Sequence, residues 1–381
     1  MVIKETVTQL SWPQVRAWRL KRQYLNARVS ETEMLEVVSM LCGLHAQLMS
    51  SAELTLWARI ENLHPERVQK ALWEERSLVK SWAMRGTLHL FPAQEYGLWQ
   101  TALTTFRHYL KDSWLRYFGV TREELEQLIA MVAQALDDRI LTRQELAEEV
   151  ARLSGSAELA EKLRESWGAM LKPVTYRGLL CFGPSSGQNV RFTRPDQWLN
   201  GSASKLEFTG AEAMLEVLRR FLASYGPVER EDFARWFGIS RAEAARLIKQ
   251  LGQEICVVEV EGLKSWLLTA HLAEIQEASS EGNVRLLPAF DQYVIGTTRQ
   301  AEYILPGPFK ERIYRQQGWI SPVILVDGRM EGVWRHEIKG KRVEVQLEPF
   351  GEMPSSVKHV AEQEAERLAV YLGKPLELLW K

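Results

Sequence analysis

The chain has 381 residues, of which 46% are hydrophobic, and its 48 Lys and Arg residues nearly balance its 49 Asp and Glu residues. This length is enough for two or three domains of about 150 residues each, and the composition is that of an ordinary soluble protein. No window approaches the roughly 18 uninterrupted apolar residues of a membrane span, and the first residues lack the apolar run of a signal peptide. These features exclude a membrane protein and predict a cytoplasmic one.

The cysteine and motif content excludes several kinds of site. Cys42, Cys181 and Cys256 lie far apart and form neither a CxxC pair nor the Cys/His spacing of a zinc site. The sequence contains no GxxxxGK[ST], GxGxxG or HExxH motif, so nucleotide-binding and zinc-protease chemistry have no support. We therefore expect buried thiols, no metal and no cofactor.

The N-terminal third is predicted to begin with capped helices. Ser11 is placed as an N-cap with Pro13 in the first turn, and this helix is expected to run to about Leu25. Ser30 and Glu33 form a capping box ahead of an apolar stripe at helical spacing. Both signals mark the start of a helix, because their side chains accept hydrogen bonds from backbone N–H groups that have no partner within the helix.

Two further helices and a hairpin complete this N-terminal unit. The helices are expected over 53–61 and from Pro65 onward, and two short strands within 78–91 are expected to turn at Arg85 and Gly86. Helices followed by a hairpin are the order of a winged helix.

The same order recurs twice along the chain. The second unit combines a long helix over 93–117 and helices capped at Thr121 and Thr142 with two strands near 176–194. The third unit, within 209–268, has a short turn at 238–240 before a helix of the recognition type.

From about residue 284 the pattern changes to strands separated by Gly, Pro and Asp-Gly turns, with a closing helix over about 357–371. The predicted fold class is therefore α+β, with three tandem winged-helix motifs followed by a C-terminal β-rich, barrel-like domain. The expected domains are 1–118, 119–200, 201–275 and 276–381.

Two clusters of basic residues could contact DNA phosphates. The first is in the N-terminal helix (Arg16, Arg19 and Arg22), and the second is on the third unit's recognition helix (Arg241, Arg246 and Lys249). A solvated helix face is the alternative for the N-terminal cluster. The helices of the second unit are rich in Glu, so we expect no phosphate contact through them.

Other conspicuous residues have structural interpretations. Most of the 14 tryptophans, including Trp18, Trp57, Trp73 and Trp236, lie at helical spacing among apolar residues and are expected in the core rather than stacked on bases. Asp327 is expected in an Asp-Gly turn, and Asp291 is a candidate for orienting the C-terminal domain.

Four segments together resemble the winged-helix family of bacterial DNA glycosylases of the AlkZ and YcaQ type. They are GLHAQLMSSAELTLWARI, KSWAMRGTLHLF, LLPAFDQYVIG and PVILVDGRMEGVW, and their order agrees with that family from about Leu10 to the final helix. The resemblance implies three winged-helix motifs and a C-terminal β-rich domain around a concave DNA-binding surface. It also implies hydrolysis of the N-glycosidic bond of alkylated purines in double-stranded DNA, including bulky adducts and, in some members, interstrand crosslinks.

The family's catalytic motif is Gln, an apolar residue, then Gln or Asp, and His45, Ala46 and Gln47 stand at its positions. If this segment is extended, side chains two residues apart point to one side. The resemblance implies that Gln47 positions a water and that His45 acts as a general base or orients that water; a protonated His45 would instead contact phosphate. Arg85 and His89 resemble family residues near the wing and are candidate DNA contacts.

The sequence leaves three functions open. The first is a monofunctional DNA glycosylase for alkylation damage, monomeric and free of cofactors. The second is a non-enzymatic winged-helix DNA-binding protein or regulator in which His45 marks altered catalysis. The third is a scaffold without DNA contact, which the near-neutral net charge allows.

Overall fold

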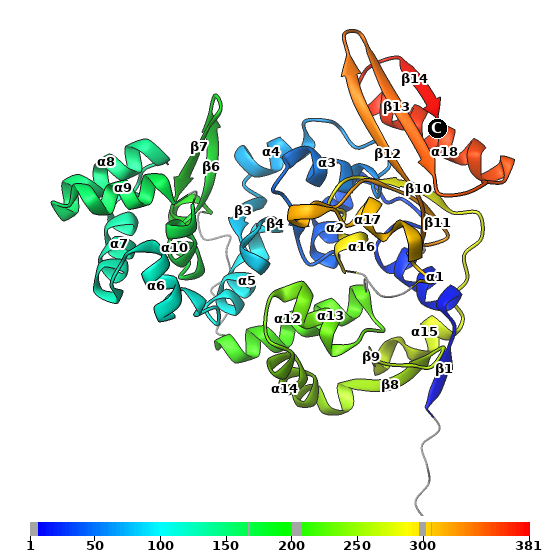
Figure 1. The fold of residues 1–381 in the computed structure, drawn as a ribbon, viewed down its shortest axis with the longest axis horizontal. Helices are drawn as coiled ribbons and strands as arrows, with labels where there is room; N and C mark the ends of the chain where they lie inside the picture. Colours follow the sequence, from blue (N-terminus) through cyan, green and yellow to red (C-terminus); the bar gives the residue numbers. More distant parts are fainter. Residues whose placement is uncertain (1–6, 167, 200–207, 297–301, 306) are drawn as a thin grey trace, which may run out of the picture. The chain divides into compact units, whose positions relative to one another are not determined.

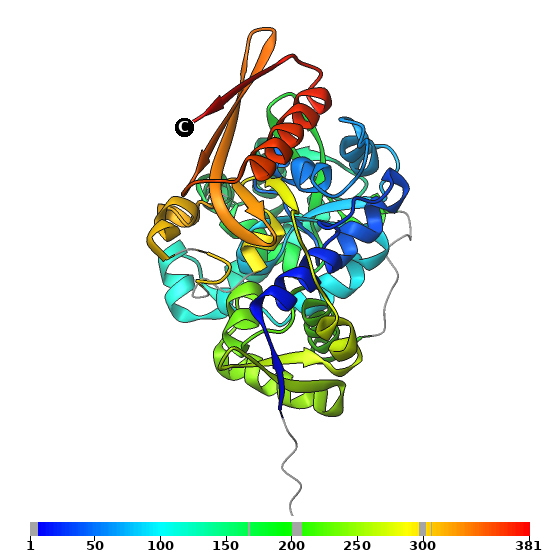
Figure 2. The same ribbon diagram turned by 90° about the vertical axis from the view of Figure 1, so that its right-hand side faces the viewer.

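The computed structural model describes residues 7–166, 168–199, 208–296, 302–305 and 307–381, and it is a mixed α+β structure (Figures 1 and 2). The chain divides into two compact units. Unit 1 joins both ends of the chain, Met1–Arg67 and Leu218–Lys381, and unit 2 is the intervening segment Val68–Val217. The four expected domain ranges stay predictions, and the boundary at 200 and 201 lies outside the described residues.

The N-terminal part of unit 1 confirms the predicted helix caps. Ser11 accepts from the Gln14 backbone N–H, and the Gln14 side chain accepts in return from the Ser11 N–H at 2.9 Å. Glu33 likewise accepts from the Ser30 N–H at 3.0 Å. The elements here are β1 (Thr8–Leu10), α1 (Trp12–Arg22), α2 (Met34–Met40), β2 (Leu44–His45) and α3 (Met49–Trp57), with α4 (Arg67–Trp73) at the start of unit 2.

A helix pair and a hairpin follow in the second part of unit 1. Gly238, with φ of 97°, ends α13, and Ser240 caps α14, so the predicted short turn is confirmed. Strand β1 adds to this hairpin in parallel, with Thr8 opposite Val258, which brings the start of the chain onto a sheet formed some 250 residues later. The elements are α12 (Gly210–Tyr225), whose first half belongs to unit 2, α13 (Arg230–Phe237), α14 (Arg241–Leu251), β8 (Ile255–Val260), β9 (Leu263–Leu268) and α15 (Leu272–Gln276).

The C-terminal β-rich region is an open five-stranded sheet in the order β10-β11-β12-β13-β14. Because β10 and β14 are its two edges, the prediction of a barrel-like domain was wrong for the part of the chain that the structure describes. The run PAFDQYVIG was expected to be extended and instead forms a loop and a short helix. The elements are β10 (Val284–Leu287), α16 (Gln292–Gly296), α17 (Lys310–Ile313), β11 (Val323–Val326), β12 (Arg329–Lys339), β13 (Arg342–Pro349), α18 (Ser355–Tyr371) and β14 (Leu376–Trp380).

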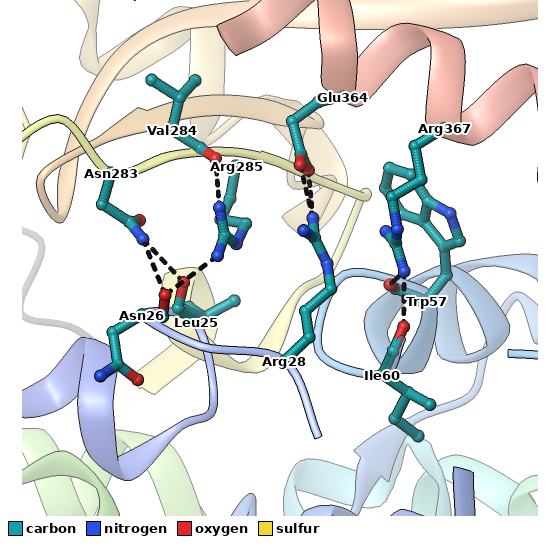
Figure 3. Close-up of polar contacts among 10 residues, drawn as sticks. All are labelled: Leu25, Asn26, Arg28, Trp57, Ile60, Asn283, Val284, Arg285, Glu364 and Arg367. Atoms are coloured by element: carbon teal, nitrogen blue, oxygen red, sulfur yellow. Dashed lines mark hydrogen bonds and ion pairs between the residues drawn. The ribbon is translucent and has the colours of Figure 1, made fainter. Parts of the chain in front are cut away.

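Arginines tie the C-terminal helix and sheet to the N-terminal segment (Figure 3). Arg28 donates to both carboxylate oxygens of Glu364 in α18, at 2.5 and 2.6 Å. Arg367, one turn further along α18, donates to the carbonyl oxygen of Trp57 at 2.8 Å, and Arg285 in β10 donates to that of Asn26 at 3.2 Å. These bonds satisfy carbonyl groups at the end of α3 and in the loop after α1.

Unit 2 contains the predicted first hairpin and a set of short helices. The long helix expected over 93–117 is broken, because the hydroxyls of Thr104 and Thr105 bond back to the carbonyls of Thr101 and Ala102 and compete with helix continuation. The elements are β3 (Leu78–Trp82), β4 (Leu88–Pro92), α5 (Tyr96–Leu103), α6 (Asp112–Phe118), α7 (Arg122–Ala135), β5 (Leu141–Thr142), α8 (Arg143–Ser154), α9 (Ala157–Glu165), α10 (Lys172–Tyr176), β6 (Cys181–Ser186), β7 (Asn189–Thr193) and α11 (Pro195–Trp198).

The core confirms most of the predicted tryptophan assignments. Trp18, Trp57 and Trp236 are buried, whereas Trp73 is half-buried and donates to Gln69. Cys42 and Cys181 are buried free thiols as expected, whereas Cys256 is partly exposed.

Candidate active site

The predicted catalytic segment connects α2 to α3 in unit 1. Cys42 and Gly43, with φ of 58° and 86°, turn the chain after α2. The next two residues form β2, so His45 is in extended backbone and its side chain is only 6% exposed. Gln47 follows in a bend and is exposed, immediately before Leu48 caps α3. The segment therefore presents one buried and one exposed polar side chain two residues apart.

An aromatic side chain from the far end of the chain packs against His45. The ring of Phe290 stacks on the imidazole, with centroids 4.7 Å apart and planes 19° from parallel. Phe290 has φ of 58°, which is uncommon for a residue with a large side chain. On its other side Phe290 meets the ring of Trp319 edge-on at 5.1 Å, and Trp319 is 40% exposed. The imidazole is thus held in a stack that begins at the protein surface.

A buried ion pair fixes the residue next to Phe290. Asp291 receives two hydrogen bonds from Arg59, at 2.7 and 2.8 Å, and both side chains are fully buried. Arg59 also donates to the carbonyls of Gln23 and Thr55, while Asp291 accepts from the Tyr293 backbone N–H. The pair joins the segment just after α3 to the start of α16, and this supports the prediction that Asp291 orients the C-terminal region.

A surface cavity of about 610 Å³ lies beside this stack within unit 1. Trp319 lines it, as does Ala289, which precedes Phe290 in the chain. Charged side chains lie on its walls, and burial lowers the pKa of His336 there. Its remaining lining residues are Glu311, Arg312, Arg315, Ser321, Pro322, Val333, Trp334, Arg335, His336 and Glu348.

The N-terminal basic cluster binds the protein's own backbone. Arg19 is buried and donates to the carbonyls of Gly226 and Pro227. Arg22 donates to Ala223, and Arg16 donates to Asp327 and Tyr303. Burial of Arg19 contradicts its prediction as a DNA contact and also the solvated-face alternative. The basic spacing on α1 is explained by docking of this helix against later segments.

The two wing candidates of unit 2 differ. Arg85 is exposed in the turn between β3 and β4, with φ of 56°, so it remains a candidate phosphate contact. His89 is buried in β4, its Nδ1 lies 3.1 Å from the Thr87 carbonyl oxygen, and its ring stacks near Phe91. Burial of His89 contradicts its prediction as a DNA contact.

The recognition helix α14 presents its basic residues to solvent. Arg241, Arg246 and Lys249 are all exposed, and Arg246 pairs with Glu243 one turn earlier. Such an exposed ion pair is weak and can exchange its partner for a phosphate. The role of these three residues in DNA binding stays a prediction.

Some site residues were missed from the sequence. Phe290 and Arg59 lie within two of the four segments that resemble the family, but neither was predicted as a site residue. Pro288 and Asp291 are turn and N-cap signals that argue against a strand at 288–296. The sequence also contains one GxSxG pattern, at 183–187, but it falls in the hairpin between β6 and β7 and not in the strand-turn-helix of a hydrolase nucleophile.

The described residues offer neither a metal site nor a membrane span. No group of three or more His, Cys, Asp or Glu side chains is arranged to hold a metal ion there. None of the helices in those ranges is long and apolar enough to cross a membrane.

Comparison with known proteins defines the class as a DNA glycosylase, a hydrolase that acts on N-glycosyl bonds. A model of the DNA glycosylase AlkZ-like family matches residues 38–371. An interstrand DNA cross-link repair glycosylase from Streptomyces sahachiroi is 36% identical over 362 residues, which cover 94% of this chain and 96% of that protein. The solved structure of Streptomyces sahachiroi DNA glycosylase AlkZ superposes with a TM-score of 0.88 at 35% identity, covering 98% of this chain and all of that one.

The chain therefore belongs to the AlkZ-like family of DNA glycosylases. The resemblance based on four short segments is confirmed, and the enzymatic interpretation is favoured over a regulator or a scaffold.

Proposed function

We propose that this protein acts as a monomer on alkylated double-stranded DNA in the cytoplasm and releases the damaged purine with His45 and Gln47. The observation that supports this site most strongly is the stack of His45 on Phe290, with exposed Gln47 two residues further on. The similarity to a cross-link repair glycosylase supports adducts and crosslinks as substrates. We also propose that the helix-and-hairpin segments work as three winged-helix motifs that hold the duplex.

The chemistry needs little beyond placement of a water. An alkylated purine carries positive charge on its ring, so it is a good leaving group, and the sugar passes through an oxocarbenium-like transition state. Gln47 can accept from the attacking water through its amide oxygen and donate through its nitrogen. Holding that water in line with the departing base supplies the main part of the rate enhancement.

His45 is proposed to assist by taking the proton that the water loses. Its Phe290 stack and low exposure support a role toward a water next to Gln47 rather than toward an open phosphate. A neutral imidazole can accept a proton near pH 7, which suits a general base. The fixed ring plane limits the directions in which the nitrogen lone pair points.

The test is single-turnover base release from a duplex that contains one alkylated guanine, corrected for spontaneous depurination. Gln47→Ala and His45→Ala are compared with the wild type and with Gln363→Ala, a surface Gln to Ala control in α18. We expect Gln47→Ala to lose about 100-fold or more in rate with unchanged DNA affinity. Unchanged release in Gln47→Ala would refute the site, and absence of release by the wild type from any alkylated duplex would refute the proposed substrate.

A further inference from the structure

A turn in unit 2, distinct from the His45 segment, brings two polar side chains over one glycine. Gly86, with φ of +69°, lies in the turn between β3 and β4. A Cβ at this position would lie 3.1 Å from Nζ of Lys172 and 3.4 Å from the hydroxyl oxygen of Tyr176. Lys172 and Tyr176 are one turn apart on α10, so both reach the same point. At 3.1 Å a Cβ would be in tighter contact with Nζ than is usual, so a side chain at position 86 would crowd Lys172.

The Tyr176 hydroxyl is buried without a hydrogen-bond partner among the described residues. The residue is 1% exposed, and its ring is packed edge-on against Phe106 and His108. Most buried polar groups in proteins are hydrogen-bonded, because leaving one unsatisfied is unfavourable. Its donor and acceptor capacity is therefore unused in this structure and could be satisfied by a ligand.

Lys172 brings a positive charge to the same place. It is half-buried, burial lowers its pKa, and within the described ranges it forms no hydrogen bond or ion pair. Lys172 and Lys111 both act with burial to lower the pKa of His108, which shows that the local field is positive. Lys172 Nζ and the Tyr176 hydroxyl thus lie close to one point beside Gly86, and no ion pair of this lysine is found among the described residues.

We propose that Lys172 and Tyr176 bind a phosphate of the DNA backbone above Gly86. An ammonium group and a neutral hydroxyl suit a phosphodiester oxygen, and contacts of this kind position a protein on DNA without reading sequence. Exposed Arg85, the neighbouring residue in the turn, adds a second cation at the rim. The inference rests on the proposed function only in taking DNA as the source of the phosphate.

The sharpest test is Tyr176→Phe, which removes one oxygen. Because that oxygen has no partner in the free protein, the variant should be as stable as the wild type or more stable. We expect its dissociation constant for an undamaged duplex to rise about 5- to 10-fold. If Tyr176→Phe binds DNA like the wild type, the hydroxyl is not a DNA contact and the proposal fails.

The roles of the Lys172 charge and of the missing side chain at Gly86 are each tested by comparing a variant with a control variant in the same unit. Lys172→Met should reduce the slope of log Kd against log salt by about one, whereas Lys162→Met, which removes a lysine paired with Glu158, should not. Gly86→Ala should weaken binding more than Gly155→Ala, because Gly155 has nearly the same φ, +68°, but nothing within 4 Å of its Cβ position. Equal effects within both pairs would overturn the proposal.

Inorganic phosphate separates the possible sources of the ligand. If the site takes a DNA phosphate, millimolar phosphate should compete weakly with duplex binding by the wild type and less by Lys172→Met. Tight binding of free phosphate that is lost in Lys172→Met would assign the site to a small phosphorylated molecule and overturn the DNA assignment. Base release by the control Lys162→Met should equal that of the wild type. If neither protein releases the base, the proposed function has failed, and this result is distinct from a loss of phosphate binding.

Discussion

The imidazole of His45 and the ring of Phe290 are stacked with their centroids 4.7 Å apart, although 244 residues lie between them in the chain. The contact gives the imidazole a defined plane that β2 alone does not supply, since a single extended residue leaves its side chain free to rotate. His45 is thus stacked on a residue whose own segment gives no indication that it contacts residue 45.

Replacing Phe290 with Leu should lower the single-turnover rate of base release by about 10- to 100-fold, because small errors in the placement of a reacting group are costly. DNA affinity should stay within about twofold, since Phe290 is not at a predicted phosphate contact. Phe290→Tyr keeps the ring and should restore most of the rate. A rate in Phe290→Leu equal to that of the wild type would show that the stack does not position His45.

The buried pair of Arg59 and Asp291 should dominate the stability of unit 1 around the site. Asp291→Ala leaves a fully buried guanidinium without its carboxylate and should cost about 3–5 kcal/mol in the free energy of unfolding. The double variant Arg59→Met, Asp291→Leu removes both charges and should recover part of that loss. Urea denaturation measures all three proteins, and a loss below about 1 kcal/mol for Asp291→Ala would contradict the assigned role.

Substitution of Arg19 should reduce stability but not DNA binding, whereas substitution of Arg246 should reduce DNA binding but not stability. Arg19→Ala removes two buried hydrogen bonds to backbone carbonyls and should destabilise the protein by about 2–4 kcal/mol without changing the salt dependence of DNA binding. Arg246→Ala removes an exposed side chain and should change stability by less than about 0.5 kcal/mol, but it should weaken DNA binding and lower the salt slope by about one. Equal DNA affinities for Arg246→Ala and the wild type would remove α14 from the interface.

Stability should fall at alkaline pH in part because of Tyr293. Burial raises the pKa of this residue to about 12, from an ordinary value of 10.0. An acid whose pKa is raised by folding ionises first in the unfolded chain, so its contribution is complete below pH 10 and is lost as the pH rises from 10 through 12. The loss amounts to about 2–3 kcal/mol in all. Unfolding free energies between pH 8 and 12 should therefore decline less steeply in Tyr293→Phe, and parallel curves would refute the assignment.

The sequence predicted local features better than distant ones. Ser11, Ser30 and the turn at 238–240 were placed correctly because caps and turns depend on neighbouring residues. The α+β class and the family were also recognised, the latter from four short segments.

The predictions that failed concerned features that depend on contacts between distant parts of the chain. Arg19 was predicted at a DNA-binding surface because its spacing matched a basic helix face, but segments more than 200 residues away bury it. The barrel-like domain failed since strand patterns do not show whether the first and last strands pair. The contact between Phe290 and His45 was not predicted either, because local sequence patterns do not show which distant residues pack together.

Unit 1 is built from both ends of the chain, and this has a consequence for synthesis on the ribosome. Residues 68–217 are continuous and can reach their native contacts as they emerge. The segment that carries His45 is made early, but Asp291, Phe290 and Trp319 are made much later, and Glu364 later still. A nascent chain that ends before Phe290 therefore has the proposed catalytic motif without its surroundings, and the proposed site is completed only as translation nears its end.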